Sequence, residues 1–383
     1  MRFAIDAHAI GCRLTGNEVY VRNLLANLAL VGSDAEFIAY LSSSGSNGCV
    51  PARIERRTIA RNPFVRLGFD LCQSLRRDRP DLLHVQYTAP LGCPVPVIVS
   101  VHDVSFLEHP EYFQPFRARQ LRLTVRRTVR AAAKVVTGSE FSRASIARAY
   151  GLDPAAIAVV PNAAAPVFRP LDRKKAGHGV LSRFGISGPF LLAVGDLQPR
   201  KNLVGLIRAF ACVVRGLPQL PHSLVIAGKD TWFSEQVREA VRASGVADRV
   251  CFTGFVTDED LLFLYNACEL FVFPSLYEGF GLPLLEAMAC GRAVACSNVS
   301  ACPEVADAAA IFFDPYSTDD MARAMTDLVL DQELRARMER LGLSRAAHFS
   351  WRRTAEMMLE IYREVASRAQ ARAQPLKSAA VTP

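Results

Sequence analysis

The hydrophobic positions of this chain fall into short runs that alternate with longer amphipathic stretches. In the first half, runs rich in Val, Ile, Leu and Phe predict buried strands at residues 3–5, 82–85, 97–101, 135–137 and 158–160. The stretches between them repeat apolar residues with helical spacing, for example at residues 17–30 and 118–133. This alternation predicts a doubly wound α/β domain with a parallel sheet.

A second series of the same kind follows a break in the pattern. Residues 166–188 contain two prolines, a basic cluster and the glycines Gly177 and Gly179, and we interpret them as a linker. Strand-like runs then resume at residues 190–194, 223–227, 250–252, 270–273, 293–296 and 310–313. We therefore predict an α/β protein with two Rossmann-like doubly wound domains, whose strand carboxyl ends face a central cleft.

The expected domain limits follow these breaks. The first domain is placed at residues 1–170, the linker at 171–188 and the second domain at 189–350. A long helical stretch at residues 351–372 is expected to pack back on the first domain. The tail at residues 373–383 is expected to be disordered.

Composition narrows the class of protein. The 383 residues suit two domains, and 50% of them are hydrophobic. No run approaches the roughly 20 apolar residues of a spanning helix, and Asp6 interrupts the first apolar run, unlike a signal peptide. Ten cysteines lack any Cys-x-x-Cys pair, so we expect reduced, buried thiols such as Cys251, Cys268 and Cys290, and no zinc site. These features favour a cytoplasmic protein.

Two adjacent cations follow the first strand of the second series. The sequence reads Gly195-Asp196-Leu197-Gln198-Pro199-Arg200-Lys201-Asn202, so Arg200 and Lys201 stand where a helix begins. A guanidinium fork, an ammonium group and helix N–H groups together suit a pyrophosphate. An ordinary solvated basic turn would have the same composition, so this string leaves both interpretations open.

A second string joins a strand, a loop and a helix over residues 273–291. Gly279 and Gly281 let the backbone approach a ligand closely, and Pro283 fits the first turn of a helix. Glu278 stays in the loop, whereas Glu286 lies about one turn into the helix. The two carboxylates can reach different hydroxyls of one elongated ligand. The chain has no Gly-x-Gly-x-x-Gly fingerprint and no P-loop, which disfavours dinucleotide and P-loop nucleotide binding.

This string resembles the E-x7-E region of family 4 glycosyltransferases, a family of retaining GT-B enzymes. Seven residues separate Glu278 from Glu286, and Pro199-Arg200-Lys201-Asn202 resembles the phosphate loop of the same family. Further matches keep the family's order at residues 100–106, 109–112, 139–142, 159–162, 300–305 and 349–351. The resemblance covers nearly all of residues 1–365.

The resemblance implies a role for each matching residue. Residues 1–170 would form the acceptor side, and residues 189–350 would bind the nucleotide sugar. Arg200 and Lys201 would bind the donor diphosphate, and Glu278 the transferred sugar. His102 would approach that sugar from the first domain, although a strand-end histidine satisfied by backbone remains the alternative. The catalytic group is then His102, Glu278, Arg200 and Lys201, and the substrate-binding group is Gly16, Asp103, Gly279, Phe280, Gly281, Leu282 and Glu286.

The resemblance also implies the reaction. The run at residues 100–112 looks like bacterial mannosyltransferases, so the expected donor is GDP-mannose, with UDP- and dTDP-sugars left open. A hexose would pass with retention to a glycan or lipid-linked acceptor in cell-surface polysaccharide synthesis. We expect no cofactor and no catalytic metal. Front-face attack, with the leaving phosphate taking the acceptor's proton, is the mechanism that the family implies.

Two departures from the family support an alternative function. Close relatives read Thr-Gly-Ile-Gly-Arg-Tyr in a loop where this chain has residues 15–20, with Glu18 and Val19 in place of the second glycine and the arginine. Ala163 stands where a glycine is expected after Pro161-Asn162. The alternative is a non-catalytic nucleotide-sugar-binding subunit of a polysaccharide assembly complex.

A row of arginines indicates a basic surface on one predicted helix. The net charge is +8, and Arg119, Arg122, Arg126 and Arg130 recur at helical spacing, flanked by Arg117 and Arg127. The row fits either an ordinary solvated face or a surface on anionic lipid, which would place the protein peripherally at the inner face of the membrane near a lipid-linked acceptor. No aromatic-interleaved basic motif points to nucleic acid.

Overall fold

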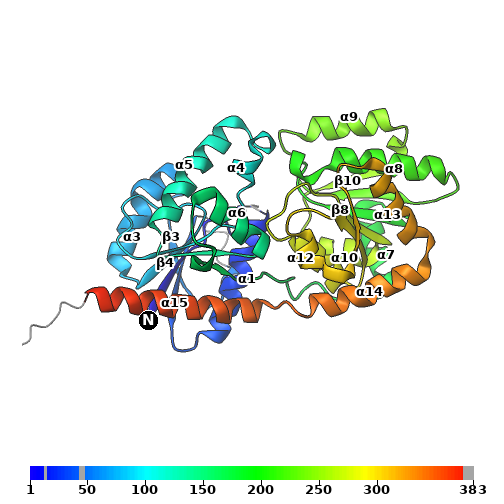
Figure 1. The fold of residues 1–383 in the computed structure, drawn as a ribbon. Coiled ribbons are helices and arrows are strands. Elements are labelled where there is room, and N and C mark those ends of the chain that lie inside the picture. Colours follow the sequence, from blue (N-terminus) through cyan, green and yellow to red (C-terminus); the bar gives the residue numbers. More distant parts are fainter. Residues whose placement is uncertain (13–14, 43–47, 374–383) are drawn as a thin grey trace, which may run out of the picture.

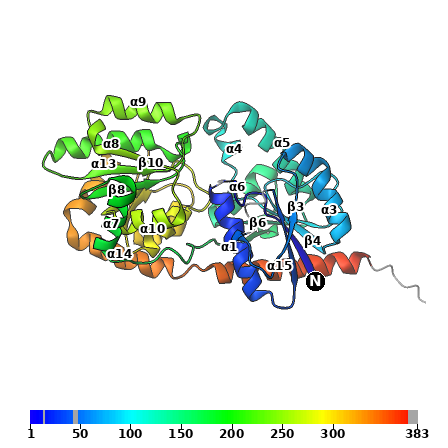
Figure 2. The ribbon, with the colours of Figure 1, turned by 180° about the vertical axis from the view of Figure 1, so that it is seen from behind.

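The protein consists of two α/β units that lie side by side. This computed structural model describes residues 1–12, 15–42 and 48–373. Figure 1 shows the first unit in blue to green and the second in green to orange, with a long red helix running under the first unit. Figure 2 shows the same two units from behind.

The first unit is built on a seven-stranded parallel sheet with the order β3-β2-β1-β4-β5-β6-β7. Its strands are β1 (Arg2–Asp6), β2 (Glu36–Leu41), β3 (Glu55–Thr58), β4 (Leu82–Gln86), β5 (Val97–Ser100), β6 (Lys134–Thr137) and β7 (Ile157–Val159). Its helices are α1 (Thr15–Val31), α2 (Pro63–Val65), the π-helix η2 (Arg66–Asp70), α3 (Leu71–Asp78), α4 (Ser105–Glu108), η3 (Pro110–Tyr112), α5 (Pro115–Ala131), α6 (Glu140–Tyr150) and η4 (Pro154–Ala156). One apolar cluster covers each face of the sheet.

The second unit is built on a six-stranded parallel sheet with the order β10-β9-β8-β11-β12-β13. Its strands are β8 (Phe190–Val194), β9 (Ser223–Ala227), β10 (Val250–Gly254), β11 (Leu270–Phe273), β12 (Ala293–Ser297) and β13 (Ile311–Phe313). Its helices are α7 (Arg173–Phe184), η5 (Pro199–Lys201), α8 (Leu203–Gly216), α9 (Ser234–Ser244), η6 (Ala247–Arg249), α10 (Asp258–Ala267), α11 (Leu282–Ala289), α12 (Cys302–Ala306), η7 (Asp307–Ala309), α13 (Thr318–Leu330) and α14 (Gln332–Ala346). Both sheets reverse their strand order beside the first strand, as doubly wound sheets do.

The strands expected from the hydrophobic runs are present in both sheets, within one or two residues at each end. β2 and β3 were not predicted. β3 reads Glu-Arg-Arg-Thr at the edge of the sheet, where its polar side chains reach water, so it carries no apolar run. The doubly wound prediction is confirmed.

The proposed linker is wrong over much of its length, because residues 173–184 form α7. Asp172 caps this helix by accepting a hydrogen bond of 2.9 Å from the backbone N–H of Lys175. Gly179 makes room for the ring of Phe263 on α10, since a Cβ there would lie 2.6 Å from a ring carbon. The glycine therefore serves helix packing within the second unit rather than a flexible connection.

The C-terminal helix α15 (Trp351–Ala373) returns to the first unit. Trp351 and Tyr362 are buried in one apolar cluster with Phe3 of β1 and Leu24 of α1. The hydroxyl of Thr354 donates a hydrogen bond of 2.6 Å to the carbonyl oxygen of Pro161. The two passages of the chain between the units are thus tied to each other. The tail at residues 374–383 lies outside the described residues.

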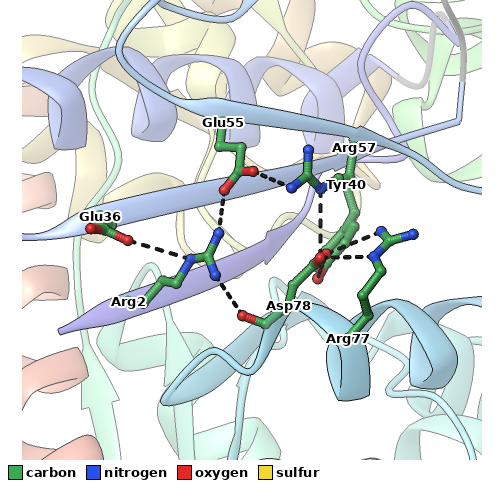
Figure 3. A network of polar contacts seen from close by, with 7 residues as sticks. All are labelled: Arg2, Glu36, Tyr40, Glu55, Arg57, Arg77 and Asp78. Carbon is green, nitrogen blue, oxygen red and sulfur yellow. Dashed lines mark hydrogen bonds and ion pairs between the residues drawn. The ribbon is translucent and has the colours of Figure 1, made fainter.

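A polar network fixes the amino ends of the first strands (Figure 3). Arg2 on β1 contacts Glu36 on β2 at 3.4 Å and Glu55 on β3 at 2.5 Å, and donates to the carbonyl oxygen of Asp78 at 2.7 Å. The buried Asp78 carboxylate accepts from Tyr40 at 2.9 Å and pairs with arginine side chains. This network lies at the edge opposite the carboxyl ends of the strands.

All ten cysteines lie in the described ranges and are free. Cys268 and Cys290 are buried as expected, whereas Cys251 is only half-buried. Among the described residues, no helix combines the length and the apolar character that crossing a membrane requires.

Candidate functional site

The carboxyl ends of the two sheets meet, and the predicted site residues gather there. Arg200 and Lys201 lie in η5, after β8. Glu278 and Gly279 follow β11, the strand beside β8. His102 follows β5 of the first sheet. The second-sheet residues therefore come from both sides of the point where the strand order reverses, which is where doubly wound sheets bind ligands.

Three charged side chains form the second-unit wall of this site. Glu278 Oε1 accepts from Arg200 Nη1 at 2.7 Å and from Lys201 Nζ at 2.6 Å. Lys201 lies flat over Gly195, where a Cβ would meet its side-chain carbons at 2.9 Å, and its ammonium group sits 4.7 Å from the centre of the Phe273 ring. One carboxylate thus holds two cations, and the cluster keeps a net positive charge.

Burial and charge act against each other in this cluster. Burial alone would raise the pKa of Glu278, but Arg200 and Lys201 outweigh it and lower that pKa to about 2. Burial lowers the pKa of Lys201, although Glu278 opposes the shift. For Arg200, burial is outweighed by Glu278 and Asp103, which raise its pKa. The carboxylate and the guanidinium are therefore charged at neutral pH.

The two units approach each other closely at Gly279. A Cβ at Gly279 would lie 2.0 Å from the backbone oxygen of His102, so no other residue fits between the walls. The carbonyl oxygen of Gly279 accepts from Ser139 Oγ at 2.6 Å and lies 2.9 Å from Ser142 Oγ, both at the start of α6. The side chain of Glu304 reaches the same helix start and accepts from the backbone of Glu140 at 2.8 Å.

The residues after Gly279 shape the loop by packing. Phe280 is buried and contacts the ring of Phe349 edge-on, with ring centres 5.9 Å apart. Gly281 adopts a φ of +96° just before α11, a conformation that favours glycine. Leu282 opens α11, and Pro283 stands in its first turn. Because the side chain of Phe280 is in the core, the expected contact of Phe280 with a ligand can come only from its backbone.

Glu286 lies on α11, apart from the charged cluster. Its Oε2 accepts from the hydroxyl of Tyr265 at 2.9 Å, and the side chain is buried. Burial raises the pKa of Glu286 to about 7, against the opposing hydrogen bond from Tyr265. The two glutamates of the E-x7-E string therefore differ strongly in their tendency to ionise.

His102 is an uncharged group on the first-unit wall. His102 Nε2 lies 3.0 Å from Gln86 Oε1, and its ring meets Tyr20 edge-on with centres 4.7 Å apart. Burial lowers the pKa of His102 to about 4, so the ring is neutral at physiological pH. Because the amide oxygen only accepts, Nε2 donates and Nδ1 is left as an acceptor. The ring of His102 is therefore held by the side chain of Gln86 and not by a backbone group.

Behind His102 runs a chain of buried hydrogen bonds that reaches the C-terminal helix. Tyr20 OH lies 2.9 Å from Ser100 Oγ, and Ser100 Oγ lies 2.8 Å from His84 Nε2. His84 Nδ1 in turn lies 2.6 Å from the hydroxyl of Tyr362 on α15. Burial lowers the pKa of His84 to about 3. This chain holds the ring that contacts His102.

Asp103 and Tyr87 complete the first-unit side. Asp103 Oδ1 accepts from the backbone N–H of Ser105 at 2.9 Å and from its hydroxyl at 2.6 Å, so this oxygen stabilises the turn into α4. Tyr87 follows β4 with a φ of +60°, an uncommon conformation for a tyrosine, and its ring centre lies 5.6 Å from that of His102. Tyr87, Tyr20 and Gln86 were not predicted.

The segment with the family departures is not a loop. Residues 15–20 form the first turns of α1. Glu18 accepts a hydrogen bond of 2.9 Å from the backbone N–H of Gly11, which supports the start of the helix. Gly16 is exposed, and a Cβ there would meet no atom within 4 Å. Ala163 is not among the residues with positive φ, so the chain turns after Asn162 without needing a glycine.

Within the described ranges, no group of three or more His, Cys, Asp or Glu side chains is placed to hold a metal ion. The charges that converge on the site come from Arg200, Lys201 and Glu278 instead.

Two family descriptions match the chain, one for each unit. Residues 14–166 match Glycosyltransferase Family 4, and residues 184–344 match Glycosyl transferases group 1. The O-antigen chain mannosyltransferase B of Escherichia coli is 30% identical over 267 residues, which cover 70% of each chain. The chain belongs to glycosyltransferase family 4. Another family relative, the serotype-specific mannosyltransferase WbdA of Escherichia coli, is 38% identical over 46% of this chain but only 22% of its own length.

Solved structures of the same fold cover this family 4 chain almost completely. Sucrose-phosphate synthase from Thermosynechococcus elongatus has a TM-score of 0.77 at 19% identity, over 96% of this chain and 99% of that one. WaaG, a glycosyltransferase involved in lipopolysaccharide biosynthesis, has a TM-score of 0.74 at 18% identity, over 94% and 99%. The two-unit GT-B fold expected from the sequence is confirmed.

Proposed function

We propose that this protein transfers a mannosyl group, with retention, from GDP-mannose to a glycan or lipid-linked acceptor in the synthesis of a cell-surface polysaccharide. The observation that carries the proposal is the cluster of Arg200, Lys201 and Glu278, which faces His102 across the junction of the sheets. Similarity to O-antigen mannosyltransferase B favours mannose among the possible hexoses.

The charged cluster suits the departure of a nucleoside diphosphate. Arg200 and Lys201 share one carboxylate oxygen of Glu278, and an incoming diphosphate offers them several oxygens in its place. As the bond from the anomeric carbon to the phosphate oxygen breaks, negative charge grows on the diphosphate, and the two cations stabilise it. We propose that this stabilisation replaces a divalent metal.

The acceptor would attack from the same face of the sugar. A new bond forms between the acceptor oxygen and the anomeric carbon, and the acceptor's proton passes to the leaving phosphate oxygen. Nδ1 of the neutral His102 can accept a hydrogen bond from a sugar hydroxyl without adding charge to the site. Glu286, which accepts a hydrogen bond from Tyr265, is proposed to bind the ribose hydroxyls.

The test combines donor binding with turnover of the purified full-length chain. Thermal shifts are recorded with GDP-mannose, UDP-glucose and dTDP-glucose, and a true donor at 100 times its dissociation constant stabilises the fold by about 2.7 kcal/mol. Transfer is then assayed with and without excess EDTA. Stabilisation by a UDP- or dTDP-sugar alone would overturn the choice of donor. An absolute requirement for a metal would overturn the proposed role of the cations.

Two glutamate variants separate catalysis from mere donor binding. Glu278→Gln should mainly lower kcat, because it removes the charge beside the reacting sugar, whereas Glu286→Gln should mainly raise the donor KM. Donor binding without transfer to any acceptor, in the wild type, would instead support a non-catalytic subunit. Normal turnover of Glu278→Gln at saturating donor would contradict the role given to Glu278.

A further inference from the structure

Large apolar side chains are exposed together on the first unit, at the carboxyl edge of its sheet. Phe64 and Phe69 follow β3 and are 74% and 64% exposed. Leu91 follows β4, and Phe116 stands in the first turn of α5, at 59% and 75%. Leu123, about two turns further along α5, is 65% exposed. Aromatic side chains at this exposure are costly in water, so their grouping indicates a contact surface.

Hydrogen bonds show that these segments adjoin one another. The backbone N–H of Leu91 donates to the oxygen of Leu67 at 2.9 Å, which joins the loop after β4 to η2. Two residues earlier, the N–H of Ala89 donates to Thr128 Oγ1 on α5 at 3.0 Å. Figures 1 and 2 both place α3, which continues η2, next to α5 on the outer side of the first unit.

The arginine row lies on the same exposed face of α5. This helix carries six arginines and no acidic residue. Arg119, Arg122, Arg126 and Arg130 are exposed, and none of them makes a hydrogen bond or ion pair with another residue in the described part of the chain. By comparison, Arg323 on α13 and Arg352 on α15 each pair with a carboxylate about one turn away.

We propose that this arginine–aromatic surface, made of Phe64, Phe69, Leu91, Phe116 and Leu123 with the four unpaired arginines, docks the protein on an anionic lipid bilayer. Apolar rings can enter the interface between headgroups and acyl chains, while guanidinium groups bind lipid phosphates. The combination fits a bilayer better than a nucleic acid, because several exposed apolar side chains would gain nothing against a phosphate backbone alone.

The position of the surface gives the docking a consequence. It lies at the carboxyl edge of the first sheet, the same edge at which His102 follows β5. Docking would bring the junction of the units close to the headgroups, so that an acceptor carried on a lipid reaches His102 without leaving the bilayer. This last step rests on the proposed transfer reaction, whereas the docking does not.

The experiment measures sedimentation of the full-length protein with lipid vesicles in the absence of any donor. Vesicles of phosphatidylcholine are compared with vesicles that also contain phosphatidylglycerol, at low and high salt. We expect binding to the anionic vesicles, weakened by salt and weak on phosphatidylcholine alone. Failure to bind the anionic vesicles would overturn the docking and leave the proposed function untouched.

Variants separate the two components of the surface. Arg122→Gln with Arg126→Gln should weaken binding about fivefold for each charge removed. Phe64→Ser with Phe116→Ser should weaken it about tenfold for each ring. All four side chains are exposed, so the variants should fold normally.

Matched controls lie elsewhere on the surface. Leu30 and Leu330 are exposed leucines, and Arg337 and Arg340 are exposed arginines on α14. The corresponding Ser and Gln variants should bind vesicles like the wild type. Binding that depends on salt but not on Phe64 and Phe116 would show a purely electrostatic surface and overturn the docking. Transfer to a water-soluble acceptor should be equal in all variants, which distinguishes lost docking from lost catalysis.

Discussion

The charged cluster of the second unit and His102 of the first unit differ in their electrostatics. On the second unit, Arg200, Lys201 and Glu278 meet through one carboxylate oxygen and remain charged or strongly paired. On the first unit, His102 is held among a tyrosine ring and an amide, and burial keeps it neutral. One wall therefore attracts an anion, and the other orients uncharged hydroxyls.

This division fits the chemistry of the substrates that we propose. A nucleoside diphosphate brings charge that must be matched in a partly buried site. A sugar hydroxyl is neutral, and a charged neighbour without a partner would only cost desolvation. The pKa of Glu278 at about 2 and that of His102 at about 4 both lie far from neutrality, so neither of these two groups changes its charge across the physiological range.

The largest loss of activity is expected when the two walls are forced apart. Gly279→Ala places a methyl group 2.0 Å from the oxygen of His102, and the walls cannot keep their present contact. A misplacement of about 1 Å can cost on the order of 100-fold in rate, and we expect at least that loss in kcat/KM. Steady-state kinetics measures it. Gly177→Ala is the control, because a Cβ there meets nothing within 4 Å, and it should leave the kinetics unchanged.

Removing one cation tests the charged wall alone. Lys201→Ala should weaken nucleoside diphosphate binding by about 10- to 150-fold, the equivalent of about 1.5–3 kcal/mol for a charge-assisted hydrogen bond. Isothermal titration calorimetry measures the affinity, and the exposed Lys174→Ala serves as control. Unchanged affinity for the diphosphate would show that Lys201 only pairs with Glu278.

Glu286 offers a finer test, because its pKa of about 7 is close to working pH. Only the ionised carboxylate accepts hydrogen bonds from two ribose hydroxyls with both oxygens, so donor affinity should rise about tenfold from pH 6 to 8. Without donor, the folded state binds this proton more tightly than the unfolded chain, so stability should fall as pH rises from about 4.5 to 7.

The control for this pH dependence is chemical. A nucleotide that lacks the ribose 2′ and 3′ hydroxyls should show no contribution from Glu286, and Glu286→Gln should flatten the profile for the normal nucleotide. An identical pH profile in wild type and Glu286→Gln would assign the titration to another group.

The smallest effect on transfer is expected from the far end of the neutral chain. Tyr362→Phe removes the hydroxyl beside His84 Nδ1 and leaves a buried polar atom without a partner, which costs about 1–3 kcal/mol of stability. Thermal unfolding measures this loss, while kcat should change little because Ser100 still contacts Tyr20. A large fall in kcat with unchanged stability would mean that the chain takes part in the reaction.

The sequence was most informative where one local pattern decided the structure. Buried parallel strands such as β8 and β11 are continuous apolar runs and were predicted to the residue. β3 was not predicted because this edge strand has no apolar run. α7 was not predicted because its glycines and basic residues are typical of a linker. In the structure, Gly179 leaves room for the ring of Phe263 on α10.

The site shows the same limit. Arg200, Lys201, Glu278 and His102 could be placed together, since each follows a strand at the carboxyl edge of a sheet. The contacts of Gln86 with His102 and of Tyr265 with Glu286 join residues from different elements, and no spacing along the chain reports them. Local patterns indicated which groups line the site but not which groups hold them.

The hydrogen bond between Thr354 and Pro161 has a mechanical consequence. The chain crosses between the units twice, and this bond fastens the two crossings to each other on one side of the molecule. A body attached to another along a single line keeps one easy rotation and loses the rest. The units should thus rotate about these two crossings, and in the proposed reaction the release of the nucleotide and the entry of the next donor would share that motion.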